Sequence, residues 1–350
     1  MTAGAARPLA DAARALAERA PRRADIEAPF AEVERAAHRL VPELAALRPA
    51  VGATPMTAVP SELGRGRVWL KLESANTAGT VKARTAYALL CAAVAQAGSA
   101  RVRIVEYSGG SLALALAEFC ALLGIDLRLV VPHGSPERLR RTLRGHGAQV
   151  SAGRPGTGFL GALDEAVRVA AAEERYLLLQ HCAAQAAAMH REHTGAEIAE
   201  RLAAEGVTPA VLAACVGSGG TALGVALALR ERWPDCGALA VFPAEAPYGD
   251  PAPPDGTPRM NGTGGLGHGL LQPLLAPYQE RFTFRTVAYP EALRAMRHLR
   301  SAHGLAVSSS GAGAWLQASR ELDHGPAGRE AVAVVAGRGT IEEWAHAAGD

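Results

Sequence analysis

"VWLKLESANTAGTVKARTA", residues 68–86, runs from an apolar, strand-like segment through a glycine-containing turn into a mostly apolar helix. It holds Lys71 and Lys82, the only two lysines in a chain whose lysines and arginines together number 36. A lysine that begins a helix among small residues is partly desolvated, which lowers the pKa of its amine and favours Schiff-base chemistry. An arginine cannot do this chemistry. The alternative for Lys82 is a solvated helix lysine.

Strand-like and helical patterns alternate from this segment to the end of the chain. Apolar runs predict strands at residues 68–73, 102–107, 126–132, 176–180, 210–216, 238–243 and 331–337. Amphipathic spacing predicts helices at about 81–97, 110–123, 136–146, 158–174, 186–205, 221–232, 290–302 and 311–322. Because apolar strands alternate with helices, we expect an α/β fold with mostly parallel, twisted sheets and helices on both faces.

Two segments depart from this alternation. Residues 1–48 have apolar positions at helical spacing but are interrupted by Pro21 and Pro29. They predict a helical extension, which serves as a surface element, a subunit-contacting arm or a lid. Residues 244–288 are rich in Gly and Pro, so we expect an irregular segment of the kind that covers a site.

Composition excludes several classes of protein. The hydrophobic fraction is 49%, the charged fraction is 20% and the net charge is +2, without a basic stripe, so nucleic acid is not an expected partner. The most apolar region, residues 112–131, is interrupted by charged residues and predicts no membrane span. The five cysteines form no CxxC pair, and the N-terminus lacks the apolar core of a signal peptide. We therefore expect buried thiols in a cytoplasmic protein.

Ligands of such sheets bind where a strand ends and a helix begins. "VGSGGTALG", residues 216–224, is a turn of this kind. Its main-chain N–H groups and the helix dipole predict an anion cradle for a phosphate. The spacing differs from that of a P-loop and from that of a dinucleotide fingerprint. The alternative is an ordinary tight turn.

A second such turn is "EYSGGSLALA", residues 106–115. The N–H groups from Gly109 to Leu112 can grip a carboxylate, unless the segment is only a capped helix start. "HREHTGAE", residues 190–197, places His190 and His193 on one helical face but lacks metal-site spacing. We expect helix-surface histidines with a structural role and no metal site.

These motifs, in this order, resemble those of the fold-type II pyridoxal-phosphate enzymes, and most of all the cysteine synthase and cystathionine β-synthase family. The resemblance spans about residues 49–340 and implies a tryptophan synthase β-like fold. It leaves out the helical extension at 1–48 and implies an N-terminal domain at 49–185 with the lysine and the substrate loop, and a C-terminal domain at 186–350 with the phosphate loop. The motifs that carry it are "VGATPM", "VWLKLESANTAGTVKARTA", "HREHTGAEI", "GSGGT", "GLGHGLLQPLL" and "GLAVSSSGA".

The resemblance also implies roles for single residues. Lys82 matches the lysine that forms the Schiff base with pyridoxal 5′-phosphate. Ser309, or alternatively Ser310, matches the serine beside the pyridine nitrogen, and Gln180 matches a substrate-facing glutamine. The phosphate loop corresponds to Gly217, Ser218, Gly219, Gly220 and Thr221. The substrate-carboxylate loop corresponds to Ser108, Gly109, Gly110, Ser111 and Leu112.

The chain departs from the family pattern around the substrate. The asparagine that contacts the cofactor's ring hydroxyl is Ser111, and two hydroxyl-bearing positions of the same loop are Gly109 and Leu112. The family's aspartate after the lysine is Ala83, and its phenylalanine after the glutamine is His181. His181 either contacts an unusual nucleophile or fills the space. These changes imply a substrate that is handled differently from that of housekeeping cysteine synthase.

The resemblance implies an enzyme that uses an amino-acid substrate and a nucleophilic co-substrate. We expect β-replacement on O-acetyl- or O-phospho-L-serine through an aminoacrylate, giving a β-substituted alanine. Lys82 would act as the base at Cα, and a neutral serine at the pyridine nitrogen would favour loss of the β-substituent. The alternatives are a lyase or dehydratase that releases the intermediate as pyruvate, and a non-catalytic subunit with the same fold. Family members are commonly homodimers, so we expect a homodimer.

Overall fold

The computed structural model describes residues 14–250, 252 and 256–349. The first thirteen residues of the predicted N-terminal extension lie outside this range. The chain forms two compact units that are interleaved in sequence. The first unit takes the described part of Met1–Val51 together with Lys82–Met189, and the second takes Gly52–Val81 together with the described part of His190–Asp350. The domain boundaries expected at residues 48 and 185 stay a prediction.

The second unit is built on a six-stranded sheet in the order β1-β2-β10-β7-β8-β9. All neighbouring strands are parallel except β1, which pairs antiparallel with β2. In the centre of the sheet Val332 lies opposite Trp69 on one side and Leu212 on the other. The strands are β1 Met56–Pro60, β2 Arg67–Leu72, β7 Pro209–Cys215, β8 Gly237–Pro243, β9 Thr283–Val287 and β10 Glu330–Val335.

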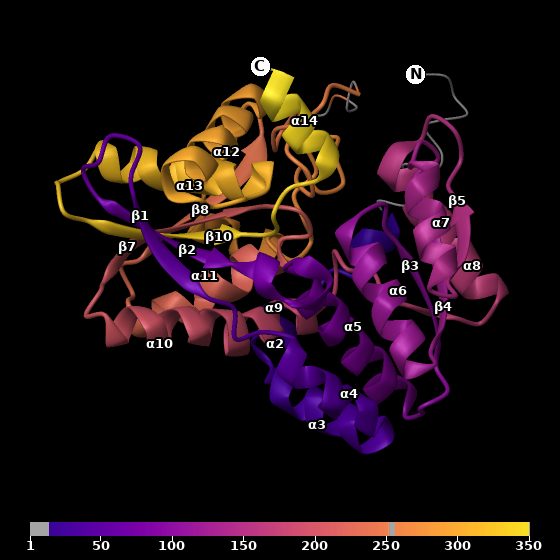
Figure 1. The fold of residues 1–350 in the computed structure, drawn as a ribbon. Helices are drawn as coiled ribbons and strands as arrows, with labels where there is room; N and C mark the ends of the chain where they lie inside the picture. Colours follow the sequence, from indigo (N-terminus) through magenta and orange to yellow (C-terminus); the bar gives the residue numbers. More distant parts are fainter. Residues whose placement is uncertain (1–13, 251, 253–255, 350) are drawn as a thin grey trace. The chain divides into compact units, whose positions relative to one another are not determined.

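Helices cover both faces of this sheet (Figure 1). One face packs against α12 and α13 through a buried cluster that includes Leu70, Ala213, Ala333 and Trp315. The other face carries α10 and α11. Side chains on alternate strand positions therefore face two separate helical layers, which explains why these strands are apolar throughout. The helices are α10 Ala196–Ala204, α11 Gly220–Arg232, α12 Tyr289–His303, α13 Ser309–Asp323 and α14 Ile341–Gly349, with a π-helical segment at His190–Gly195.

The first unit is built on a four-stranded parallel sheet in the order β5-β4-β3-β6. Its most buried helix, α5, has every side chain from Ala83 to Val94 buried, which fits its apolar, non-amphipathic sequence. The strands are β3 Arg103–Tyr107, β4 Asp126–Val131, β5 Gln149–Ala152 and β6 Tyr176–Leu177. The helices are α2 Arg23–Glu27, α3 Phe30–Leu40, α4 Pro42–Leu47, α5 Lys82–Ala97, α6 Ser111–Leu123, α7 Glu137–Gly145, α8 Gly158–Ala172 and α9 Ala184–Met189.

The predicted fold class is confirmed, and each of the seven predicted strands occurs in a mostly parallel sheet. The expectation of an irregular segment at 244–288 is wrong at its end, where Thr283–Val287 forms the edge strand β9. Its residues are largely exposed, so the strand lacks the apolar pattern of its neighbours. Strands β1 and β5 were also not predicted. A proline ends β1, and β5 has only four residues, so neither shows an apolar run.

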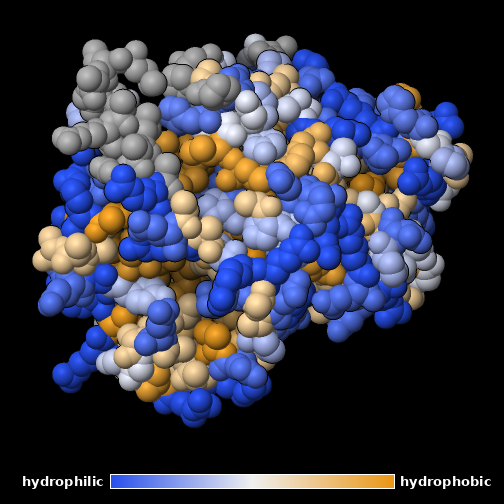
Figure 2. Space-filling view, turned by 180° about the vertical axis from the view of Figure 1, so that it is seen from behind, coloured by the Kyte–Doolittle hydropathy of each residue, from blue (hydrophilic) through white to orange (hydrophobic). Residues whose placement is uncertain are grey.

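The surface agrees with the balanced composition. On the face shown in Figure 2, hydrophilic side chains predominate and hydrophobic ones show between them. In the part of the chain that the structure describes, no helix combines the length and the apolar character that a membrane crossing requires. All five cysteines are free thiols, and four of them are buried.

Candidate active site

Lys82 is the first residue of α5, directly after a constrained turn. In that turn both Ala78 and Gly79 have left-handed backbone conformations, with φ values of 58° and 66°. Alanine rarely adopts such a conformation, so the turn holds backbone strain next to the lysine. The Lys82 side chain is half-buried, and burial lowers the pKa of its amine to about 8. A much larger fraction of this amine is neutral near pH 7 than of an ordinary lysine.

The loop at 108–112 lies between the end of β3 and the start of α6, in the same unit as Lys82. Ser108 is buried, and its Oγ accepts a hydrogen bond of 3.2 Å from the N–H of Ala113. Gly109 is required by its surroundings, because a Cβ atom there would lie 2.8 Å from Cδ of Pro132. Leu112 is also buried, whereas Ser111 is exposed.

The main-chain donors of this loop are unused. Among the described residues, none of the N–H groups from Gly109 to Leu112 donates a main-chain hydrogen bond, and none donates to a side chain. Unpaired N–H groups at a helix N-terminus attract an anion. The loop therefore keeps the donors that a carboxylate needs, although two hydroxyl-bearing side chains of the family pattern are absent.

Gln180 and His181 follow β6 and lie beside the end of β3, because β3 and β6 are parallel neighbours. The side-chain amide of Gln180 donates to the carbonyl of Tyr107 at 3.3 Å. Nδ1 of His181 pairs with the hydroxyl of Tyr107, and the two rings stack with their centroids 5.5 Å apart. Leu179, just before them, has a left-handed φ of 50°. The structure thus brings the predicted glutamine and histidine to the carboxyl end of β3, where the loop at 108–112 begins.

The electrostatics of this region are unusual. Burial raises the pKa of Glu106 to about 8, although main-chain N–H groups partly offset this. Burial also lowers the pKa of His181 to about 3, with a further contribution from the positive charge of Lys82. At neutral pH the carboxyl of Glu106 is therefore protonated and the imidazole of His181 is neutral. Sequence inspection missed Glu106 and Tyr107, whose only signal was their position before the substrate loop.

The loop at 217–221 lies in the second unit, between β7 and α11. Gly219 has a φ of 94°, and a Cβ atom there would lie 2.9 Å from Cγ of Leu275. Within the described chain, no main-chain N–H from Gly217 to Thr221 donates a hydrogen bond. This loop is a largely buried set of free donors at the N-terminus of a 13-residue helix, which is the arrangement that binds phosphate.

Thr221 is held by a histidine whose environment the sequence did not predict. Nε2 of His190 lies 3.1 Å from Oγ1 of Thr221, and Nδ1 lies 2.9 Å from Oγ1 of Thr194. The expectation of a surface histidine is wrong for His190, which is fully buried. The helix widens to a π-helix at His190–Gly195, and this local change turns His190 toward α11.

Ser309 is the first residue of α13, in the second unit. Its hydroxyl donates to Oε1 of Glu343, and it accepts a hydrogen bond of 3.0 Å from the N–H of Asn261. Its proton is thus already directed to a buried carboxylate on α14. Oγ of Ser310 lies 3.1 Å from Oγ of Ser308. The contact between Ser309 and the pyridine nitrogen stays a prediction.

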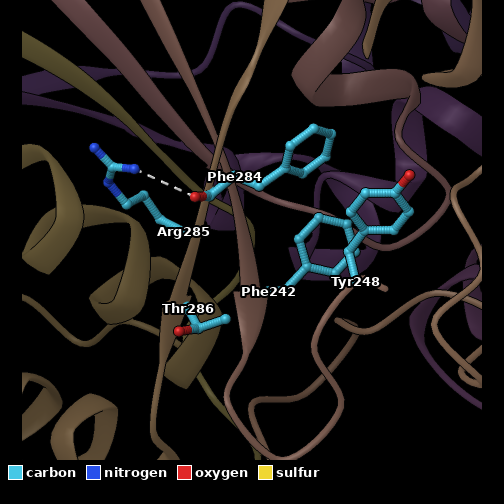
Figure 3. A pocket seen from close by; sticks show the side chains of 5 residues that line it. All are labelled: Phe242, Tyr248, Phe284, Arg285 and Thr286. Atoms are coloured by element: carbon cyan, nitrogen blue, oxygen red, sulfur yellow. Dashed lines mark hydrogen bonds between the residues drawn. The ribbon is translucent and has the colours of Figure 1, made fainter. Parts of the chain in front are cut away.

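One pocket contains none of the predicted site residues. It has a volume of about 350 Å³ and lies at the β8–β9 edge of the second unit, where Phe242, Tyr248 and Phe284 form an aromatic cluster. Figure 3 shows Arg285 pointing away from the three rings, as alternation along β9 requires. Among the described residues, no cluster of three or more His, Cys, Asp or Glu side chains is suited to a metal ion.

Two mostly parallel α/β units, with free N–H groups at two strand-to-helix turns, define a class of α/β protein that can bind anionic ligands. Comparisons with known proteins identify the family. Residues 47–337 match the family model of the pyridoxal-phosphate-dependent enzymes. The chain belongs to this family of pyridoxal-phosphate-dependent enzymes.

Relatives support the same family. Cysteine synthase A of Escherichia coli is 31% identical over 56% of this chain and 61% of its own length. N-(2-amino-2-carboxyethyl)-L-glutamate synthase of Cupriavidus metallidurans is 33% identical over 55% of this chain and 58% of its own length. Both matches therefore span less than two thirds of the relative. The structure of O-ureido-L-serine synthase has a TM-score of 0.74 at 22% identity, covering 85% of this chain and 92% of its own.

The residues present fit pyridoxal 5′-phosphate. A lysine with a lowered pKa can form the Schiff base, and the free N–H groups from Gly217 to Thr221 can hold the phosphate. A glycine is required at 219 to keep this loop in place, since a Cβ atom there would clash with Leu275. The predicted cofactor is confirmed by the family, whereas the role of each residue remains a proposal.

Proposed function

We propose that this enzyme catalyses β-replacement on an activated L-serine, O-acetyl- or O-phospho-L-serine, and produces a β-substituted alanine. The observation that carries the proposal is the unused row of N–H donors from Gly109 to Leu112, in the same unit as a lysine with a lowered pKa. The donors suit the carboxylate of an amino acid, and the lysine suits proton transfer at its Cα.

Different residues of this chain would have different roles in the reaction. In the proposal, the loop at 108–112 fixes the substrate carboxylate, and Gln180 supports that loop through the carbonyl of Tyr107. Lys82 would hold the cofactor, and its amine would take the proton from Cα of the substrate. Gly217 to Thr221 hold the phosphate, and His190 fixes Thr221. When bound, pyridoxal phosphate supplies the electron sink for the bond changes at Cα and Cβ.

The departures in the substrate loop favour a specialised product over bulk cysteine. Similar proteins are named for three kinds of product: cysteine, an N-substituted glutamate and O-ureido-L-serine. These names correspond to sulfur, nitrogen and oxygen bonded to the β-carbon of alanine. We infer that the nucleophile of this enzyme is not restricted to sulfide.

A direct test is to incubate the cofactor-loaded enzyme with each serine ester, with and without candidate nucleophiles. We expect release of acetate or phosphate that depends on a nucleophile, together with a new β-substituted alanine and little pyruvate. Lys82→Ala should abolish both. Pyruvate formed in place of the amino acid would establish the lyase alternative. Absence of any acid release, with cofactor bound, would support the non-catalytic alternative.

We also propose a homodimer in the cytoplasm. The proposal rests on the resemblance to cysteine synthases, and the N-terminal helices are candidates for a subunit contact. Light scattering at several protein concentrations tests the assembly, with a mass near twice 36.2 kDa expected. A mass near 36.2 kDa at all concentrations would refute it.

A further inference from the structure

His181, at the carboxyl end of β3, has one ring nitrogen bonded to Tyr107 and the other without a hydrogen bond within the described residues. His181 is 2% exposed, and its ring stacks on that of Tyr107 and meets the ring of Phe159 at a steep angle. Each of the three rings contacts the other two, so they form one aromatic cluster in the first unit. A side chain that merely filled the space of the family's phenylalanine would not need a polar edge.

The hydrogen bond to Tyr107 decides which nitrogen carries the proton. Among the described residues, the Tyr107 hydroxyl has no hydrogen-bond partner except Nδ1 of His181. If Nδ1 carried the proton, the buried tyrosine proton would have no acceptor, which is costly. Tyr107 therefore donates to Nδ1, and the neutral ring carries its proton on Nε2. The pKa of Tyr107 is raised well above its usual value by burial, so the hydroxyl keeps its proton.

The second ring nitrogen of His181, Nε2, is available as a hydrogen-bond donor. Nε2 of His181 makes no hydrogen bond within the described part of the chain, and the ring is near enough to Lys82 for the charge of that amine to disfavour protonation of the imidazole. The imidazole cannot act as a cation, so it does not repel the lysine. It instead presents one uncharged, fixed N–H group.

We propose that His181, held by Tyr107, is a specificity-determining residue whose Nε2–H binds an oxygen acceptor of the reacting molecules at the carboxyl end of β3, where the loop at 108–112 begins. This inference rests on the proposed β-replacement. The acceptor has two possible sources, the leaving group of the serine ester and a carboxylate on the co-substrate. Sulfur is a weak acceptor, so sulfide gains little from this donor. A site with such a donor selects partners that carry oxygen.

The tautomer can be measured without turnover. In cofactor-loaded enzyme with nitrogen-15-labelled histidine, NMR should show His181 with a protonated Nε2 and a bare Nδ1. The signal is assigned by its loss in His181→Phe. It should not change as the pH falls from 8 to 5, because the ring stays neutral. A protonated Nδ1, or titration within this range, would overturn the proposal.

Kinetics of three variants identify the acceptor. His181→Phe removes the donor, whereas His181→Gln keeps an N–H group, and Tyr107→Phe/His181→Phe also removes the unpaired tyrosine hydroxyl. We expect His181→Phe and the double variant to lose about tenfold in one half-reaction, and His181→Gln to recover part of it. Loss in the release of acetate or phosphate without co-substrate assigns the leaving group. A raised KM for L-glutamate, with KM for sulfide unchanged, assigns the co-substrate.

Two negative results have different meanings. If the wild-type enzyme is active and His181→Phe matches it in both half-reactions, this inference fails and the proposed function stands. If the wild-type enzyme releases no acid from either ester, the proposed function fails, and this role of His181 fails with it.

Discussion

Nζ of Lys71 lies 2.6 Å from Oε2 of Glu197 and 2.6 Å from the carbonyl oxygen of Thr54. The lysine side chain is only 2% exposed, so this ion pair joins β2 to α10 inside the second unit. The two lysines of the chain therefore differ in their roles. Lys71 is bound to a carboxylate and holds the fold, whereas Lys82 has a lowered pKa and suits chemistry.

Lys71→Met should destabilise the protein. The substitution removes the amine that compensates a partly buried carboxylate, and breaking such a pair costs about 3 kcal/mol. We expect the free energy of unfolding, measured with urea, to fall by about this amount, while Lys82→Met does not lower it. Lys71→Met/Glu197→Gln should recover part of the loss. Equal stability of Lys71→Met and the wild type would show that the pair does not hold the sheet.

The amine of Lys82 should capture the cofactor at an unusually low pH. Only the neutral amine attacks an aldehyde, and its fraction rises with pH through a pKa of about 8 instead of 10.5. Apoenzyme mixed with pyridoxal phosphate should therefore gain visible absorbance at a rate that increases with a midpoint near pH 8. Lys82→Ala serves as the blank. A midpoint near that of free lysine would contradict the desolvation of this amine.

Glu106 should make the protein less stable as the pH rises. Its pKa is about 8 in the folded chain, whereas an unperturbed glutamate has a pKa of 4.5. Between these values the unfolded chain has lost the proton that the folded chain keeps, so the free energy of unfolding falls with pH. His181 has the opposite effect between about 3 and 6.5. The effect of Glu106 is therefore clearest from pH 6.5 to 8, at roughly 1.4 kcal/mol per pH unit.

Glu106→Gln should remove this slope, because the amide does not titrate. Urea unfolding of the cofactor-saturated proteins across that range measures it. Glu200→Gln, which changes an exposed side chain of α10, should keep the wild-type slope. Parallel pH profiles for Glu106→Gln and the wild type would mean that Glu106 is ionised in the folded protein.

Gly219→Ala should weaken cofactor binding. The left-handed backbone at φ 94° costs an alanine about 1–2 kcal/mol, and its Cβ would lie 2.9 Å from Cγ of Leu275. We expect the dissociation constant for pyridoxal phosphate, from absorbance titration of the apoenzyme, to rise about tenfold or more. Gly206→Ala is the matched control, since it has a φ of 69° with open space around it. It should lose stability but keep its affinity; an equal loss of affinity would exclude a local role for Gly219.

Much of the architecture could be predicted from the sequence. Apolar runs alternating with helical spacing require parallel strands covered on both faces, and the central strands β2, β7, β8 and β10 were predicted within one or two residues. Three edge strands, β1, β5 and β9, escaped prediction because one side of an edge strand meets solvent, whereas the edge strand β6 was predicted. Their side chains, such as those of Thr283 and Arg285 in β9, therefore carry no apolar signal.

The candidate site also contains some residues that the sequence predicted and others that it did not. Short motifs indicated Lys82, the loop at 108–112 and the loop at 217–221. The residues that make a lysine or a glycine-rich turn recognisable lie within a few positions of each other in the sequence. Partners remote in sequence were not predictable. The hydroxyl of Ser309 bonds Glu343, 34 positions away, and the hydroxyl of Tyr107 bonds His181, 74 positions away.

By itself the sequence determined the alternation of strands and helices, the position of the reactive lysine and the two turns with free N–H groups. These depend on neighbours within one or two helical turns. Only the tertiary structure decided that Lys71 meets Glu197, that His181 is neutral with its proton on Nε2, and that Glu106 is buried without its usual charge. Burial and charge pairing depend on which strands become neighbours, and that order joins segments far apart in the chain.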